Sequence, residues 1–245
     1  MLDIIFCFVD QQNRFRASDN FRKKTSYPIE VPLKDRYAKT CKNEDLVKKG
    51  SFVINKSKSD NMISKYDWDF KAFLQKGTSG LELQLMGELN AEDGGYCNEI
   101  EISDEFRKCG IATTLMEFCF TDDDVGGIDL EEDTIFKMQT LEKWRKMATN
   151  NCKHIVFLVC LPTKPTPFEA CSAYLTAAIN TGHIMMFTHP NEEQEMDVMN
   201  VATYAKQELK KGAKDFIEEH GTRWYFCKCK PERIEQCKAM DSEQF

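Results

Sequence analysis

Alternating apolar and polar positions in the first hundred residues predict a series of β-strands. Short segments rich in glycine, serine and aspartate separate the later strands at 78–80 and 93–95. Consecutive strands joined by short turns favour an antiparallel meander. The apolar segment 3–9 predicts one further strand, and the polar segment 11–50 predicts loops with one or two short helices. The predicted meander strands are 51–55, 66–75, 81–85 and 96–103.

From residue 111 onward, apolar residues recur at spacings of three and four, which is typical of helices that pack one face on a core. Gly182 and Gly221 follow the last apolar positions of two such runs, where glycine commonly ends a helix. The predicted helices are 111–120, 134–149, 168–178 and 191–220. The strands predicted between and after them are 154–160, 183–188 and 223–229. The whole pattern indicates an α/β (α+β) domain in which helices flank a mixed, largely antiparallel sheet.

Composition narrows the class of protein. The chain has 245 residues, 42% hydrophobic and 30% charged, as in soluble globular proteins. A net charge of −7 argues against sequence-independent nucleic-acid binding, which needs clustered cations. No apolar run approaches the roughly 20 residues that cross a bilayer, and no cationic segment precedes the apolar residues 2–9. Eleven cysteines at irregular spacing suit buried thiols in a reducing compartment, so we expect the cytoplasm or nucleus.

Residues 107–112 have the features of a phosphate-binding turn between a predicted strand and a predicted helix. The first amide N–H groups of a helix have no intrahelical partner and carry partial positive charge, so they bind anions. Arg107 and Lys108 add full positive charges, and Gly110 permits a backbone conformation that a Cβ would penalise. An ordinary strand-to-helix turn has the same outline, so the residues alone leave both interpretations open.

The surrounding segment 99–116 resembles motif A of the GNAT acetyltransferase superfamily. Members of this family carry a strand, a short acidic or proline-containing turn, and then Arg/Gln-x-x-Gly-x-Gly/Ala at the start of a helix. Arg107, Gly110 and Ala112 occupy the three defining positions, and Asp104 stands where proline is frequent. The similarity extends over about residues 66–230 and is strongest at this motif.

The resemblance implies a GNAT-type fold and an acyl-CoA-dependent N-acyltransferase. Residues 1–65 would form an N-terminal elaboration of the same domain, residues 66–245 the core, and helix 191–220 an insertion before the last strand. Acetyl would pass from acetyl-CoA, the cosubstrate, directly to a primary amine of a small molecule or peptide in a ternary complex. No metal, nucleic acid or membrane partner is expected. The alternative is a non-catalytic module that binds CoA or acts through protein interactions.

The resemblance also implies which residues bind acetyl-CoA. A backbone N–H near Ile100 or Ile102 would polarise the acetyl carbonyl, and the turn with the first residues of the helix would bind the pyrophosphate. The implied binding residues are Ile100, Ile102, Arg107, Lys108, Cys109, Gly110, Ile111, Ala112 and Thr113.

Glu101 and Glu99 are candidate general bases because they share one face of the predicted strand, while Ile100 and Ile102 share the other. Glu101 is preferred because it lies nearer the turn; the alternative for both is an exposed sheet face. The family often has a tyrosine as general acid at the position that is Ala178 here. Tyr174, one helical turn earlier, is the nearest candidate acid, and core packing is its alternative.

Some residues of metal-binding or reactive type are expected to have no such role. A partial calcium-loop pattern lacks the bidentate glutamate and predicts an acidic loop. A histidine and three cysteines near the C-terminus lack the usual Cys-x-x-Cys spacing, so no zinc site is expected. Cys109 lies near a helix N-terminus, which lowers a thiol pKa and could make this cysteine reactive; no nucleophilic role is expected, because transfer in the GNAT family is direct. The two metal-like groups are Asp122, Asp124, Gly127 and Asp133, and His220, Cys227, Cys229 and Cys237.

Overall fold

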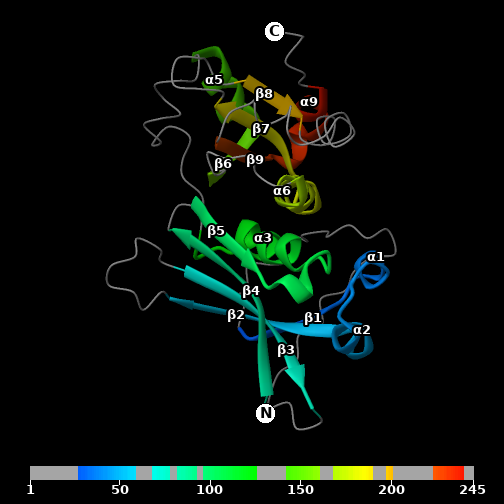
Figure 1. Cartoon of the computed structure of the whole chain (residues 1–245). Coiled ribbons are helices and arrows are strands. Elements are labelled where there is room, and N and C mark those ends of the chain that lie inside the picture. The colour runs from blue at the N-terminus through cyan, green and yellow to red at the C-terminus, as the bar shows by residue number, and fades with distance from the viewer. Residues whose placement is uncertain are drawn as a thin grey trace.

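Nine strands of the described residues form one mixed sheet in the computed structural model, in the order β1-β2-β3-β4-β5-β6-β9-β7-β8. Helices flank this sheet, as the hydrophobic pattern predicts. In Figure 1, β1–β5 and β6–β9 occupy two ends of the molecule, and helices α3 and α6 lie next to each other between them. The structure describes residues 27–58, 68–77, 82–92, 96–125, 142–160, 168–189, 197–200 and 223–239.

The first five strands are consecutive antiparallel neighbours, which confirms the predicted meander. The first strand was not predicted, because prolines at positions 28 and 32 interrupt its sequence; it lies at the sheet edge, where proline is tolerated. The predicted strand 3–9 and the predicted turns at 78–80 and 93–95 lie outside the described residues. The strands are β1 (Ile29–Pro32), β2 (Ser51–Lys58), β3 (Trp68–Lys76), β4 (Glu82–Glu92) and β5 (Tyr96–Ile102).

Two short helices connect β1 to β2, as expected for the polar N-terminal segment: α1 (Asp35–Ala38) and α2 (Glu44–Lys49). Asn43 caps α2 by accepting a hydrogen bond from the Leu46 amide at 2.9 Å. Gly50 ends α2 in the left-handed conformation, with φ 72°. The two helices thereby connect β1 to β2, which pair with each other. Both strands belong to the same sheet as the strands of the predicted core, residues 66–245.

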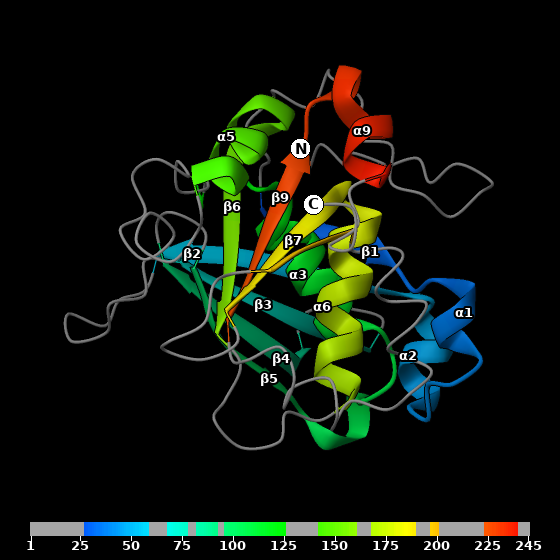
Figure 2. The same cartoon turned by 90° about the horizontal axis from the view of Figure 1, so that it is seen from above.

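The second half of the sheet combines sequence-distant strands. β6 (Cys152–Cys160) runs parallel to β5 and antiparallel to β9 (Arg223–Cys229), which also pairs with β7 (His183–His189). Figure 2 shows β6, β9 and β7 side by side, with α6 beside α3. The helices of this region are α3 (Ile111–Thr121), α5 (Glu142–Asn151), α6 (Phe168–Asn180) and α9 (Ile234–Ala239).

One predicted helix is wrong in the part that is described. Asp197–Asn200, expected within helix 191–220, forms strand β8 and pairs with β7 at the edge of the sheet. Pairing with β7 satisfies the backbone groups of that strand, which outweighs helical periodicity in so short a segment. The rest of the predicted helix lies outside the described residues, as do residues 134–141 of the helix predicted at 134–149.

The apolar stripe of α3 forms the centre of the core. Ile111, Leu115 and Cys119 are fully buried, and the helix packs on β3, β4 and β5 and against α6. The alternate residues Phe70 and Ala72 of β3 are buried on the face that joins the same core. Within the described residues, no helix is both long and apolar enough to span a membrane.

The cysteines differ in part from the expectation of buried thiols. Two disulfides join Cys41 to Cys109 and Cys229 to Cys237. The first links positions 68 residues apart, which only packing of the N-terminal segment against α3 brings together. The expectation is confirmed for the four buried free cysteines of the described chain, Cys97, Cys119, Cys152 and Cys227.

Protein stability is expected to fall in mild acid because of His183. Burial, with a smaller effect of Lys228, lowers the pKa of His183 from 6.5 to about 3, and its ring accepts or donates a hydrogen bond with the Thr181 hydroxyl. The unfolded chain binds this proton below about pH 6.5 and the folded chain only below about pH 3. The free energy of unfolding should therefore be about 2 kcal/mol lower at pH 5 than at pH 7 from this residue.

Urea unfolding of wild type and His183→Gln at both pH values measures this effect. The variant should lose about 2 kcal/mol of the difference between pH 7 and pH 5 and retain what the carboxylates contribute. An identical pH difference in the two proteins would show that His183 does not cause the acid sensitivity.

Candidate functional site

The turn between β5 and α3 leaves the first amide groups of α3 without intrahelical partners. After a short 3-10 turn at Asp104–Phe106, Lys108 and Gly110 adopt left-handed φ values of 64° and 77°. The first intrahelical bond runs from the Thr114 amide to the Gly110 carbonyl at 3.0 Å. The amide groups of residues 111–113 precede that bond, so they are the helix donors that can bind an anion.

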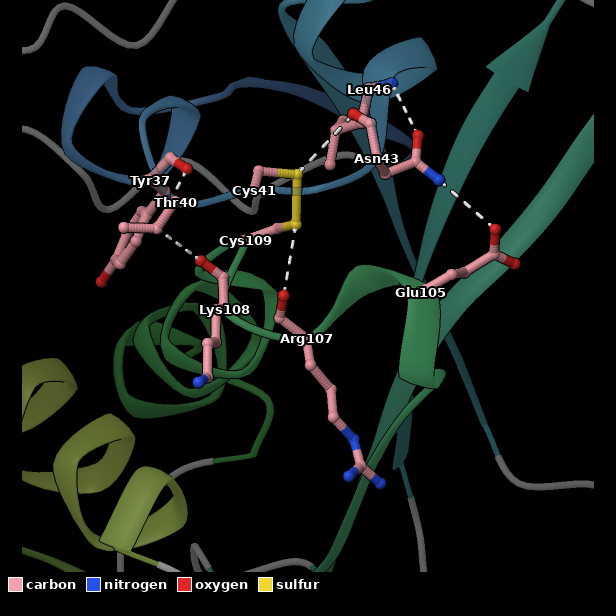
Figure 3. The surroundings of a disulfide bond; sticks show 9 residues. All are labelled: Tyr37, Thr40, Cys41, Asn43, Leu46, Glu105, Arg107, Lys108 and Cys109. Carbon is pink, nitrogen blue, oxygen red and sulfur yellow. Dashed lines mark hydrogen bonds between the residues drawn. A yellow bond between two sulfur atoms is a disulfide. The ribbon is translucent and has the colours of Figure 1, made fainter.

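Arg107 and Lys108 supply the positive charge at this turn, and both side chains are exposed. Figure 3 shows them extending away from the Cys41–Cys109 disulfide. Arg107 forms an ion pair with Asp104 at 2.8 Å, but the two side chains are 69% and 88% exposed. So exposed a pair contributes little to stability, and an anionic ligand can replace the carboxylate at little cost.

The N-terminal segment covers another side of the turn, which the sequence did not reveal. The Thr40 hydroxyl donates to the Lys108 carbonyl at 2.9 Å, and the Tyr37 ring lies where a Cβ on Gly110 would stand. Cys109, a candidate reactive thiol with no expected nucleophilic role, is bonded to Cys41. The cysteine is paired and buried within this contact, which rules out a free reactive thiol in this structure.

The Tyr37 contact makes Gly110 more sensitive to substitution than other left-handed glycines. Gly182 has almost the same φ, 78°, but a Cβ there would meet nothing within 4 Å. Gly182→Ala should cost roughly 1–2 kcal/mol from the backbone alone, and Gly110→Ala should cost more because the methyl group meets Tyr37. Urea unfolding of both variants measures the difference. Tyr37→Ala should remove the excess, and equal costs in the wild-type background would contradict the contact.

The β5 amides expected to polarise an acyl carbonyl point away from β4. The Ser103 amide donates to the Met86 carbonyl of β4 at 3.0 Å. Because successive amides of a strand point in opposite directions, those of Ile100 and Ile102 point toward the β6 side. β6 ends at Cys160, and its pairs with β5 are Tyr96↔Leu158 and Cys97↔Val159. The Ile100 and Ile102 amides thus lie on the part of β5 that extends beyond β6.

Glu99 and Glu101 lie on the exposed face of the sheet. Both side chains are exposed, and they stand opposite Asn90 and Glu88 on β4. Ile100 and Ile102 point to the other face, where they pack against the core that contains α3. The two carboxylates therefore share a face, as predicted, and that face is open to solvent.

Tyr174, the candidate acid, belongs to the buried core. It lies on α6 and packs edge-on against Trp224, with ring centroids 6.5 Å apart. Ala178, the position at which the family often has tyrosine, is also buried. The position of Tyr174 favours the core-packing alternative.

Glu117 is a buried acidic residue that the sequence analysis missed. Its carboxylate accepts hydrogen bonds from the Lys34 ammonium at 2.8 and 2.9 Å and from the Asn180 amide. It also lines a small pocket with Phe118, Thr121 and Thr181. The signal was present, because Glu117 is the acidic residue of the otherwise uncharged helix 111–120.

Asp122 and Asp124, expected in a solvated acidic loop, instead form ion pairs with Lys56 on β2. The Tyr27 hydroxyl donates to Asp122 at 3.0 Å, and burial together with that carboxylate raises the pKa of Tyr27. The expectation for Asp122 is wrong because it is buried against β2, which no local pattern showed. Gly127 and Asp133 lie outside the described residues, so the remainder of the loop is not placed.

The chain matches no family model, no curated protein and no solved structure. A function must therefore be proposed from the turn before α3, the β5 amides and the side chains around them.

Proposed function

We propose that the protein is an acyl-CoA-dependent N-acyltransferase with a GNAT-type fold, which transfers acetyl from acetyl-CoA to a primary amine in a ternary complex. The observation that carries this proposal is the short distance along the chain between β5 and the start of α3. The turn that begins α3 directly follows β5, so anion-binding amides and the Ile100 and Ile102 amides lie at the same end of one strand. Acetyl-CoA joins its thioester to its pyrophosphate through the extended pantetheine arm, so its binding needs donors of both kinds within the reach of that arm.

In this proposal the pyrophosphate binds the amides of residues 111–113 together with Arg107 and Lys108. The Tyr37 ring covers Gly110, so the anion approaches from another side, where Ala112 is partly exposed. The Ile100 or Ile102 amide donates to the acetyl carbonyl oxygen and stabilises the charge that develops there. Residues 100–113 would in this way position both the pyrophosphate and the acetyl thioester of acetyl-CoA.

Glu101, or alternatively Glu99, accepts a proton from the substrate ammonium, directly or through water, and the neutral amine then attacks the acetyl carbonyl. The exposed sheet face admits an acceptor of any size, so a small molecule or a peptide amine fits equally well. The thiolate of CoA leaves readily, so the reaction does not require Tyr174 as an acid. We place this activity in the cytoplasm or nucleus, on the number and spacing of the cysteines.

Thermal unfolding with and without acetyl-CoA tests the proposal. Ligand at 100 times its dissociation constant adds about 2.7 kcal/mol to the native state, which should raise the Tm of a chain this size by about 5–10 °C. Arg107→Glu should abolish most of that rise, because it places a negative charge beside the pyrophosphate. Lys48→Glu is the matched control: it makes the same charge change at an exposed position of α2 and should leave the rise intact.

The second candidate function is a non-catalytic CoA-binding or protein-interaction module. The contact of Tyr37 and the Cys41–Cys109 disulfide with the turn favours it, because both cover part of the proposed binding surface. The burial of Tyr174 favours it as well. A Tm that does not change with acetyl-CoA, CoA or longer acyl-CoAs would contradict the enzyme. A rise in Tm without transfer to any amine would indicate a CoA-binding module.

A further inference from the structure

Four buried cysteines meet where the C-terminal helix α9 packs beside the sheet. Cys152, the first residue of β6, stands opposite Cys229 on β9. The sulfur atoms of Cys152, Cys229 and Cys237 lie within 4.8 Å of one another. Cys227 shares a strand face with Cys229, and its thiol interacts with that of Cys152. Cys152 is therefore the cysteine that neighbours the other three.

We propose that Cys152, Cys227, Cys229 and Cys237 bind one zinc ion when the Cys229–Cys237 disulfide is reduced. Zinc prefers four ligands in a tetrahedron, and thiolates are its usual ligands in structural sites. A Zn–S distance of about 2.3 Å places the sulfur atoms of such a site roughly 3.8 Å apart. The sulfur atoms of Cys152, Cys229 and Cys237 need small shifts of side chains to reach that geometry. Cys227, which is not in that group of three, has to turn toward them as well.

The sequence predicted no metal, and the reason is the position of Cys152. Cys227 and Cys229 have Cys-x-Cys spacing, which lacks the usual zinc-binding turn. The candidate fourth ligand was then His220, which lies outside the described residues. Antiparallel pairing of β6 with β9 brings Cys152 to the other three cysteines, and no local sequence pattern shows that pairing.

Cys237 links the C-terminal segment to this cluster. Residues 231–236 are all exposed, and Cys237 is the buried residue of the segment 231–237. A disulfide or a metal bond at Cys237 therefore adds to the packing of α9 against β7 and α5. The disulfide uses two of the four sulfur atoms, whereas a zinc ion would use all four.

A thiol or a phosphine serves as the reductant of the Cys229–Cys237 disulfide. The Cys229–Cys237 S–S bond takes up two electrons and two protons from the reductant, which is oxidised, and gives two thiols. The four thiols then lose four protons as four Zn–S bonds form.

Metal titration of the full-length protein tests the site. We would reduce the protein anaerobically with a phosphine, remove metals, and add Co²⁺ and then Zn²⁺. Reduced wild type should bind one equivalent of Co²⁺ with strong sulfur-to-metal charge-transfer absorbance, and Zn²⁺ should displace it with a Kd in the nanomolar range or tighter. Protein with the disulfide intact should bind no metal at this site.

Cys152→Ala should weaken zinc binding by roughly 100-fold or more, because it removes the central ligand. The matched control is Cys119→Ala, which removes a buried free thiol of α3 and should bind as wild type does. X-ray absorption of zinc-loaded wild type should show four sulfur ligands, and this readout does not depend on the folding of a variant. Equal affinity in wild type and Cys152→Ala, or a shell dominated by oxygen and nitrogen, would overturn the proposal.

Discussion

Lys56→Met is expected to lower the free energy of unfolding by about 3–5 kcal/mol. The Lys56 side chain is 4% exposed and pairs with Asp122, whose side chain is 5% exposed. The Lys56 ammonium also lies 3.9 Å from the centre of the Trp68 ring. Methionine retains most of the apolar volume and removes the charge, so the main loss comes from leaving the Asp122 carboxylate buried without its cation.

Two further variants distinguish the loss of the buried charge pair from other causes of destabilisation, and urea unfolding measures all three. Lys56→Met/Asp122→Leu removes both charges and should recover much of the stability, because no uncompensated charge remains. Lys71→Met removes a pair with Glu88 in which the side chains are 37% and 31% exposed, and it should cost less than about 1 kcal/mol. A Lys56→Met cost no larger than that of Lys71→Met would contradict the role of burial.

Glu101→Gln is expected to lower kcat for acetyl transfer by roughly 10²–10⁴-fold if Glu101 is the general base. Glutamine keeps the size and polarity of the side chain but does not accept the ammonium proton. The position is exposed, so stability and acetyl-CoA binding should remain as in wild type. The measurement is the pH profile of kcat: its acid limb should be lost in the variant.

Glu99→Gln is the matched control, because Glu99 lies two residues earlier on the same exposed face. It should retain most of the activity, since it is farther from the turn before α3. A large loss of activity in Glu99→Gln alone would identify Glu99, and not Glu101, as the general base. Full activity in both variants would show that neither carboxylate is the base, and water would then be the remaining proton acceptor.

The hydrophobic pattern predicted elements well where a strand or helix is long and one of its faces is buried. The strands β3 and β5 and the helices α3 and α6 appear close to their predicted bounds, whereas β2 and β4 begin close to the predicted residue but extend to Lys58 and Glu92, beyond the predicted ends at 55 and 85. The hydrophobic pattern did not predict β1 and β8, which have four residues each and depend on pairing with a neighbouring strand. Short edge strands carry too few residues for a period of two to be recognised.

The sequence by itself determined the local structure at the candidate site. Gly110 adopts the left-handed conformation that its position predicts, and α3 begins at the following residue. The alternation of Glu99 and Glu101 with Ile100 and Ile102 placed the carboxylates and the isoleucines on opposite faces of β5. These features follow from the backbone preferences and the periodicity of neighbouring residues, so a single segment carries all the information they need.

Only the tertiary structure decided which distant residues meet. The contact of Tyr37 with Gly110, the pairing of Lys56 with Asp122 and the approach of Cys152 to Cys229 each join separate segments. Such contacts depend on which strands pair and in which register, and on the burial that the whole core provides. A thiol, a carboxylate or an ammonium group has the same local sequence signal whether it ends in solvent or beside its partner, so its role emerges only once the sheet is assembled.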